Sequence, residues 1–242
     1  MATRNLFMTH LPREANNLYE NLGAGLFEDV SGPTGLGPSS LGHTGFGTSW
    51  FDVDNDGWLD ILVINGAIEA IQGREDELFP YDEPNLLFRN IQNGRFDDVI
   101  DKGGAAFDLS EVSRGAAFGD IDNDGDTDVV VVHNSGAARP LINEVGSRQH
   151  WNRSESRRGH WPPGPARGAR RRDPLRHDVV ATRACGHASY ASANDPRVLV
   201  GLGASVETPR VCVVWPSGQV EEWTELAIDR YTTLTEGQGT NR

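Results

Sequence analysis

One nine-residue pattern occurs twice in this 242-residue chain and constrains its fold more than any other feature. The segment 52–60 reads DVDNDGWLD, and the segment 120–128 reads DIDNDGDTD, 68 residues later. A second landmark repeats almost in step, because LYEN at 18–21 and LFRN at 87–90 are 69 residues apart. Two independent landmarks with nearly one offset indicate a duplicated structural unit.

The duplicated unit is predicted to be all-β. Runs rich in β-branched residues, at 61–64 and 129–132, directly follow the two acidic segments and are typical of strands. No long stretch of the chain has a convincing helical period. Four-stranded units at this spacing favour blades of a β-propeller with long loops, of which 66–84 is one. The alternative is a β-sandwich in which the internal similarity is accidental.

The two acidic segments are predicted to bind calcium. Alternate carboxylates on a tightly curled loop can converge on one point, and a hard cation such as Ca²⁺ takes six to eight oxygen ligands. The glycine in each segment allows the sharp turn that this convergence needs. The first loop would supply the side chains of Asp52, Asp54, Asp56 and Asp60 and the main-chain carbonyl of Trp58. The second would supply the side chains of Asp120, Asp122, Asp124 and Asp128 and the carbonyl of Asp126.

These loops are not EF-hands. An EF-hand needs a bidentate Glu at loop position twelve, between two helices. Position twelve is Val63 in one loop and Val131 in the other, and the flanking segments are predicted strands. The remaining alternative is a pair of solvated turns that are rich in Asp because Asp suits turns.

Composition excludes several classes of function. The chain has 22 basic and 35 acidic residues, so its formal net charge of −13 disfavours duplex nucleic acid as a partner. No apolar run is long enough to span a membrane. The chain has only two cysteines, of which Cys212 is expected to be a small core residue. The chain has no Gly-x-Ser-x-Gly motif, which disfavours a serine hydrolase with a Ser–His triad. The close aspartates could act as a general acid and base, but their identical repetition with interleaved Asn and Gly favours metal binding, and we expect no enzyme activity.

The motifs resemble a known family. RGAAFGDIDNDGD at 114–126 and WFDVDNDGWLD at 50–60 are similar to the FG-GAP (VCBS) repeats of integrin-type propellers. The tail, with NDPR at 194–197, GLG at 201–203 and WPSG at 215–218, resembles the ASPIC/UnbV domain that ends members of the cartilage acidic protein family. The resemblance implies a partial propeller of two to three blades followed by a small β domain.

The resemblance also implies a function. Such proteins are secreted, hold structural calcium in the loops, and bind or adhere to a protein or carbohydrate, so an extracellular or periplasmic location is expected. Two alternatives stay open: an accessory protein of bacterial secondary metabolism, and a non-functional gene fragment. No signal peptide is visible, and the chain resembles a truncated member. Because a propeller closes with four to eight blades, open blade edges are expected to favour self-association.

Charge divides the chain into three expected parts. Residues 1–146 hold the propeller repeats, and 188–237 hold the ASPIC/UnbV-like domain, with strands expected at 199–200, 211–215, 220–223 and 231–234. Between them, 147–187 is rich in Arg, Pro and Gly, and its residues 147–177 carry nine arginines but only two acids. Our hypothesis for 152–187 is a compensated frameshift, and the alternatives are a disordered linker or a basic arm that binds anionic partners.

Overall fold

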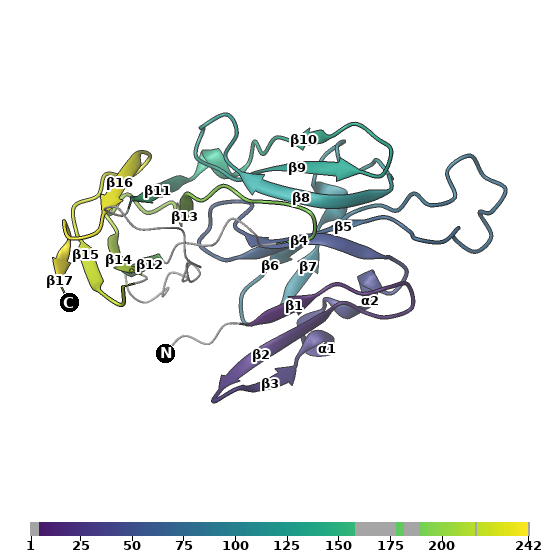
Figure 1. Ribbon diagram of the computed structural model, residues 1–242, viewed down its shortest axis with the longest axis horizontal. Helices are drawn as coiled ribbons and strands as arrows, with labels where there is room; N and C mark the ends of the chain where they lie inside the picture. The colour runs from purple at the N-terminus through teal and green to yellow at the C-terminus, as the bar shows by residue number, and fades with distance from the viewer. Residues whose placement is uncertain (1–4, 158–177, 182–188, 216, 242) are drawn as a thin grey trace.

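The computed structural model describes residues 5–157, 178–181, 189–215 and 217–241 (Figure 1). Within these ranges the chain folds almost entirely into strands, turns and loops. The α-helices α1 (Ser31–Thr34) and α2 (Gly37–Ser40) are single turns, and short 3₁₀ turns occur at Ile100–Lys102 and Gly146–Arg148. The all-β prediction is confirmed.

Three consecutive antiparallel sheets form the part of the chain that contains the repeats. The middle sheet contains β4 (Gly45–Phe51), β5 (Asp60–Asn65), β6 (Leu86–Asn90) and β7 (Phe96–Asp98), hydrogen-bonded in that order. The first contains β1 (Leu6–Met8), β2 (Asn17–Gly23) and β3 (Leu26–Asp29), and the third contains β8 (Ser113–Gly119), β9 (Asp128–His133) and β10 (Arg139–Leu141). These are blade-like sheets that do not close into a ring, so the predicted partial propeller is confirmed.

Strand β5 joins the three sheets through two hydrophobic clusters. All six of its residues are buried. Leu62 and Ile64 belong to the cluster shared with the third sheet, whereas Ile61 and Val63 belong to the cluster shared with the first. Because side chains alternate between the two faces of a strand, a strand covered on both faces needs a continuous apolar run. The sequence ILVI provides that run.

The C-terminal unit is built from two further sheets. One has β11 (His150–Arg157) between β13 (Val198–Gly203) and β16 (Tyr231–Thr235). The other is ordered β12 (Asp178–Ala181), β14 (Arg210–Val214), β15 (Val220–Trp223) and β17 (Thr240–Asn241). The four strands expected in this region are therefore present as β13 to β16. Leu202, Trp215 and Leu234 lie in its core, and Cys212 is buried in β14 as expected.

The segment 147–187 does not behave as one separate part. Its residues 150–157 and 178–181 form β11 and β12, and both strands pair with strands of the C-terminal unit. Asn152, Arg153 and Ser154 are buried although they are polar. Distant residues bind two of these side chains: Ala227 O accepts from the Asn152 side-chain amide (3.2 Å), and Asp120 and Asp195 pair with Arg153. The rest of the hypothesised frameshift segment, 158–177 and 182–187, lies outside the described residues.

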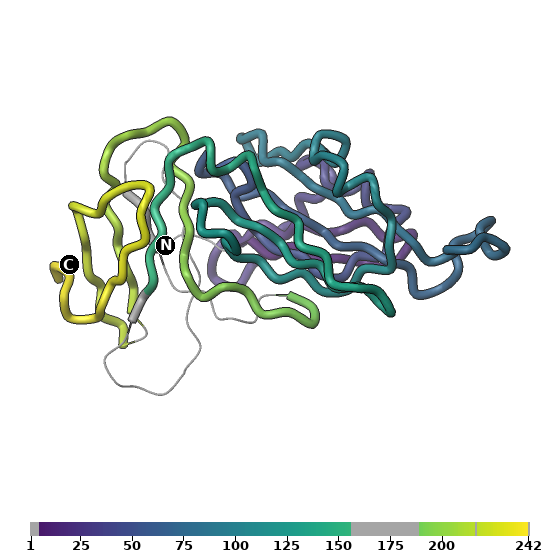
Figure 2. Tube along the Cα trace, turned by 90° about the horizontal axis from the view of Figure 1, so that it is seen from above, coloured from purple at the N-terminus to yellow at the C-terminus, as the bar shows by residue number. Residues whose placement is uncertain are grey.

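The C-terminal unit lies at the end of the repeat sheets where the two acidic loops are, and the long segment 66–85 extends from the opposite end (Figures 1 and 2). The segment 189–197 runs along β8, where the Asp195 amide donates to Phe118 O (2.9 Å). No helix in the described part of the chain has the length and apolar character that crossing a membrane requires.

Candidate metal centre

The two acidic loops occupy equivalent places and have the same backbone shape. The first connects β4 to β5, and the second connects β8 to β9. In both, the Asn and the Gly adopt positive φ: 51° and 89° at Asn55 and Gly57, 64° and 99° at Asn123 and Gly125. Asn and Gly are the residues that tolerate this region best, so the repeated Asn-Asp-Gly specifies the curl of each loop.

The first Asp of each loop accepts hydrogen bonds from the curled backbone. The Gly57 amide donates to Asp52 Oδ2 (2.8 Å), and the equivalent Gly125 amide donates to Asp120 Oδ2 (3.1 Å). The Asp56 amide also donates to Asp52 Oδ1 (3.0 Å). These bonds hold the first carboxylate on the inner side of the turn.

The last Asp of each loop connects the loop to the third strand of its sheet. Asp60 accepts from the amides of Val53 (2.8 Å) and Asn90 (2.7 Å). Asp128 accepts from the equivalent amides of Ile121 (2.7 Å) and Asn143 (2.8 Å). In the first sheet, Asn5 Oδ1 accepts from the Asn21 amide in the same manner (3.2 Å). The last Asp therefore has a bracing role that Asn5 shares.

In the first loop, three of the predicted ligands come together. Asp52, Asp54 and Asp60 each place a carboxylate oxygen within 4.8 Å of the other two. Asp54 Oδ1 is buried and has no hydrogen-bond partner among the described residues. Asp56 is not part of this group, and its Oδ1 accepts from the Trp58 amide (2.8 Å).

Burial makes this carboxylate group unfavourable when it is fully charged. The pKa of Asp52 is raised to about 8, first because burial disfavours the charged form and then because Asp60, Asp56 and Asp54 repel it. The pKa of Asp60 is raised to about 7 by burial and by the charges of Asp54 and Asp56. Arg89, which is 44% exposed, offsets part of this charge from outside, with Nη2 2.5 Å from Asp54 Oδ2.

The second loop brings together a different set. Oxygens of Asp120, Asp122 and Asp124 lie within 4.8 Å of one another. Asp126 and Asp128 are outside this group. Asp126 is buried, its Oδ2 accepts from the Ser147 amide (2.8 Å), and its pKa is raised to about 7, chiefly by burial.

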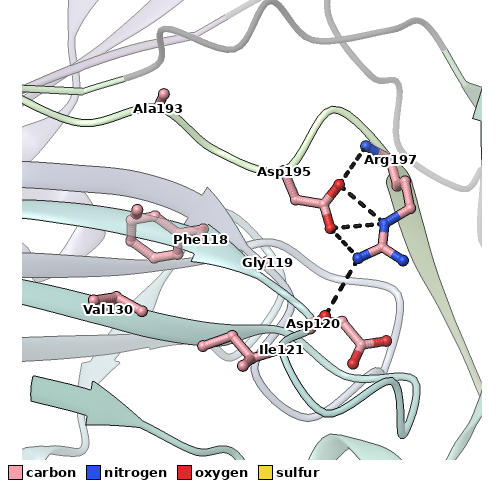
Figure 3. A pocket seen from close by; sticks show the side chains of 9 residues that line it. Phe118, Gly119, Asp120, Ile121, Val130, Ala193, Asp195 and Arg197 are labelled. Atoms are coloured by element: carbon pink, nitrogen blue, oxygen red, sulfur yellow. Dashed lines mark hydrogen bonds and ion pairs between the residues drawn. The ribbon is translucent and has the colours of Figure 1, made fainter.

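Asp120 also accepts from an arginine and a phenol, whereas the equivalent Asp52 accepts from backbone amides of its own loop. Asp120 Oδ2 accepts from Arg153 Nη1 and from the Tyr231 hydroxyl (2.6 Å). Arg153 in turn contacts Asp195, which pairs with Arg197 (2.6 Å between Asp195 Oδ2 and Arg197 Nη2). Figure 3 shows Asp195 and Arg197 beside the start of the loop.

The sequence analysis did not identify four residues of this site: Arg153, Asp195, Arg197 and Tyr231. Asp195 and Arg197 belong to the NDPR segment, which attracted notice only as a family landmark. With Phe118 and Ile121 they line a shallow depression of about 320 Å³ (Figure 3). No local pattern indicated a role for Arg153, because its partners Asp120 and Asp195 are far away in the sequence.

The first loop fits a hard cation better than the second. Its ligands are all oxygens and three of them converge. A buried carboxylate oxygen of Asp54 has no hydrogen-bond donor within the described ranges. A divalent cation there would be held by Asp52, Asp54 and Asp60. In the second loop Asp120 Oδ1 is likewise without a donor among the described residues, but Oδ2 is engaged by an arginine.

A Ser–His–Glu arrangement occurs at the other end of the third sheet. The Ser113 hydroxyl lies 3.1 Å from His133 Nδ1, and Glu111 Oε2 lies 3.0 Å from His133 Nε2. Ser113 is only 1% exposed, and Glu111 also pairs with Arg139 (2.7 Å). A nucleophile must reach its substrate, so this arrangement reads as a buried polar brace between β8 and β9.

Comparisons with known proteins agree with the two parts of the fold. The model of the FG-GAP-like repeat matches residues 5–63 and 72–131, and the ASPIC and UnbV model matches residues 176–241. No curated protein compared with the chain matches it. The repeat matches cover β1 to β4, β6 to β8 and most of β5 and β9, and the ASPIC and UnbV match covers β12 to β17. The chain therefore belongs to the family of FG-GAP repeat proteins that carry an ASPIC/UnbV domain.

Proposed function

We propose that this protein is a calcium-binding repeat protein with an extracellular binding or adhesion role, in which calcium is structural. The first acidic loop is the site that the geometry supports best. One observation carries the proposal: oxygens of Asp52, Asp54 and Asp60 converge within 4.8 Å, while Asp54 Oδ1 is buried and has no donor in the part of the chain that the structure describes. Three close carboxylates are stable together in their charged forms only when a positive charge offsets their repulsion.

Bound calcium would stabilise the connection between two strands. Asp52 directly follows β4, and Asp60 is the first residue of β5. A cation shared by the two would fix the loop and remove the repulsion that raises both pKa values. Extracellular modules bind calcium with dissociation constants of about 10⁻⁴–10⁻³ M, which suits a compartment where calcium is abundant.

The long segment 66–85 supports a role in binding a protein or carbohydrate. It extends away from the repeat sheets (Figure 1) and exposes Ile68, Leu78, Phe79 and Tyr81. Leu78 is 83% exposed and Phe79 is 59% exposed. Large apolar side chains grouped on a projecting segment are typical of contact surfaces.

Thermal unfolding of the full chain tests the structural role of calcium. We expect the melting temperature to rise by several degrees when millimolar calcium replaces a chelator, and we expect Asp54→Asn to abolish that difference. Glu75→Gln, in the exposed segment, is the control for loss of one acid. Equal melting temperatures of the wild type with calcium and with chelator would refute the proposal.

A further inference from the structure

The two acidic loops have nearly identical sequences but different positive partners. In the second loop, Asp120 contacts Arg153 of β11, and the two side chains are each 1% exposed. In the first, the equivalent Asp52 accepts hydrogen bonds from backbone amides within the described part of the chain, those of Asp56 and Gly57. The arginine beside the first loop, Arg89, is 44% exposed and pairs with Asp54 from outside.

Arg153 is held in place by the C-terminal unit. It lies on β11, which is hydrogen-bonded to β13 on one side and to β16 on the other. Its Nη2 lies 2.5 Å from Asp195 Oδ2, and its guanidinium lies over the Tyr231 ring at 4.7 Å from the ring centroid. The Tyr231 hydroxyl donates to Asp120 (2.6 Å). The guanidinium cannot leave Asp120 without moving the strand that carries it.

A second arginine extends the contact. Arg197 Nη1 donates to Asn123 Oδ1 (3.2 Å), and its Nη2 donates to the Asp120 carbonyl (3.4 Å; Figure 3). Trp151 of β11 packs on Gly125, where an added Cβ would lie 1.9 Å from the indole. The second loop is therefore covered by the C-terminal unit at its first, fourth and sixth positions.

We propose that the second acidic loop is the site where the ASPIC/UnbV unit docks through an ion pair, and that the Arg153 guanidinium supplies there the positive charge that calcium supplies in the first loop. The chain then binds one calcium ion, at the first loop. The calcium part of this inference rests on the proposed function, whereas the docking part does not.

Charge explains why the two partners exclude each other at the second loop. A guanidinium donates hydrogen bonds and accepts none, so it satisfies a carboxylate oxygen that would otherwise be a ligand. A divalent cation bound to Asp120 would lie a few ångströms from a buried positive charge, in a site with little water to screen the repulsion. The exposed Arg89 can turn to solvent, but Arg153 cannot.

Position-matched variants of the full chain test the docking part without calcium. In chelator, we expect Asp120→Asn to lower the melting temperature by about 10 °C, because it leaves a buried arginine without its carboxylate. The equivalent Asp52→Asn should lower it less or raise it, because it removes a repelled charge. If both variants melt alike in chelator, the docking assignment is wrong.

Calcium titration decides the rest and remains informative if Asp120→Asn does not fold. We expect one ion per wild-type chain by calorimetry, lost in Asp54→Asn and retained in the equivalent Asp122→Asn. Two ions per chain, or loss of binding in Asp122→Asn, would overturn the inference while leaving the proposed function intact. No binding in the wild type would refute the proposed calcium site itself, and the chelator melts would still decide the docking part.

Discussion

Asn55 and Asn123 occupy the same position in the two acidic loops but face opposite environments. Asn55 is fully buried and donates its side-chain amide to the carbonyls of Gly125 and Gly146, at 3.0 Å each. Asn123 is exposed, and its Oδ1 accepts from Arg197 and Tyr231. One repeated residue thus joins the second sheet to the third in one copy, and the third sheet to the C-terminal unit in the other.

This difference predicts unequal costs for the same substitution. We expect Asn55→Ala to reduce the free energy of unfolding by about 1–3 kcal/mol more than Asn123→Ala, because it removes two buried hydrogen bonds, to the carbonyls of Gly125 and Gly146. Both residues have positive φ, so the backbone strain of alanine is common to the pair. Urea unfolding of both variants measures the difference, and equal midpoints would contradict the bridging role of Asn55.

A second prediction concerns Gly201 of β13, which passes directly over the first loop. A Cβ at Gly201 would lie 2.4 Å from the Asn55 carbonyl carbon, and the neighbouring Gly203 amide donates to Asn55 O (2.8 Å). We expect Gly201→Ala to cost about 1–3 kcal/mol by forcing the C-terminal unit away from the loop. Gly42→Ala, where a Cβ meets nothing within 4 Å, is the control and should change stability by less than about 0.5 kcal/mol. Similar unfolding midpoints for both variants would show that the contact is not tight.

Local sequence patterns predicted the strands that follow the acidic loops, because the residues that specify each loop and strand lie within a few positions of one another. The strand-forming run 61–64 directly follows the loop that curls through Asn55 and Gly57, so sequence neighbours are structural neighbours. The 68-residue offset between the loops also separates β4 from β8 and β5 from β9. The two runs predicted as strands, 61–64 and 129–132, lie within β5 and β9.

The docking contacts could not be predicted in this way. Arg153 contacts Asp120 and Asp195, which are 33 and 42 residues away, and its own segment has no apolar period. A buried strand is normally recognised in a sequence by its apolar residues. Strand β11 instead buries polar side chains, of which Asn152 and Arg153 bind residues far away in the sequence. The distinction between the two loops also depends on the fold, because their aspartates are nearly identical in sequence.

The raised pKa values predict an unusual dependence of stability on pH. Between the ordinary value of 3.8 and the raised value of about 8 at Asp52, the folded protein binds more protons than the unfolded chain. The free energy of unfolding should therefore fall as pH rises through this window in the presence of a chelator. Asp60, with a pKa of about 7, adds to the same trend. Unfolding midpoints between pH 5 and 8 measure it.

The same measurement has an internal control. Asp52→Asn removes the carboxyl whose pKa is raised more. The free energy of unfolding of this variant should therefore fall less steeply between pH 5 and 8 than that of the wild type. Saturating calcium should flatten the wild-type profile, because the ion binds the deprotonated carboxylates. If the wild type in chelator and Asp52→Asn have the same dependence of stability on pH, the pKa of Asp52 is not raised in the folded protein.

The last prediction concerns the first sheet, whose outer strand exposes large apolar side chains. All four residues of β3 are exposed, including Leu26 at 64% and Phe27 at 49%. An exposed edge strand with apolar side chains is a template for pairing with another chain. We expect concentration-dependent self-association in light scattering, weakened by Leu26→Lys, since a charged edge opposes pairing. Leu78→Lys introduces the same charge at a more exposed leucine in the 66–85 segment and should leave association unchanged. A wild type that stays monomeric at high concentration, or an equal effect of both variants, would contradict association through this edge.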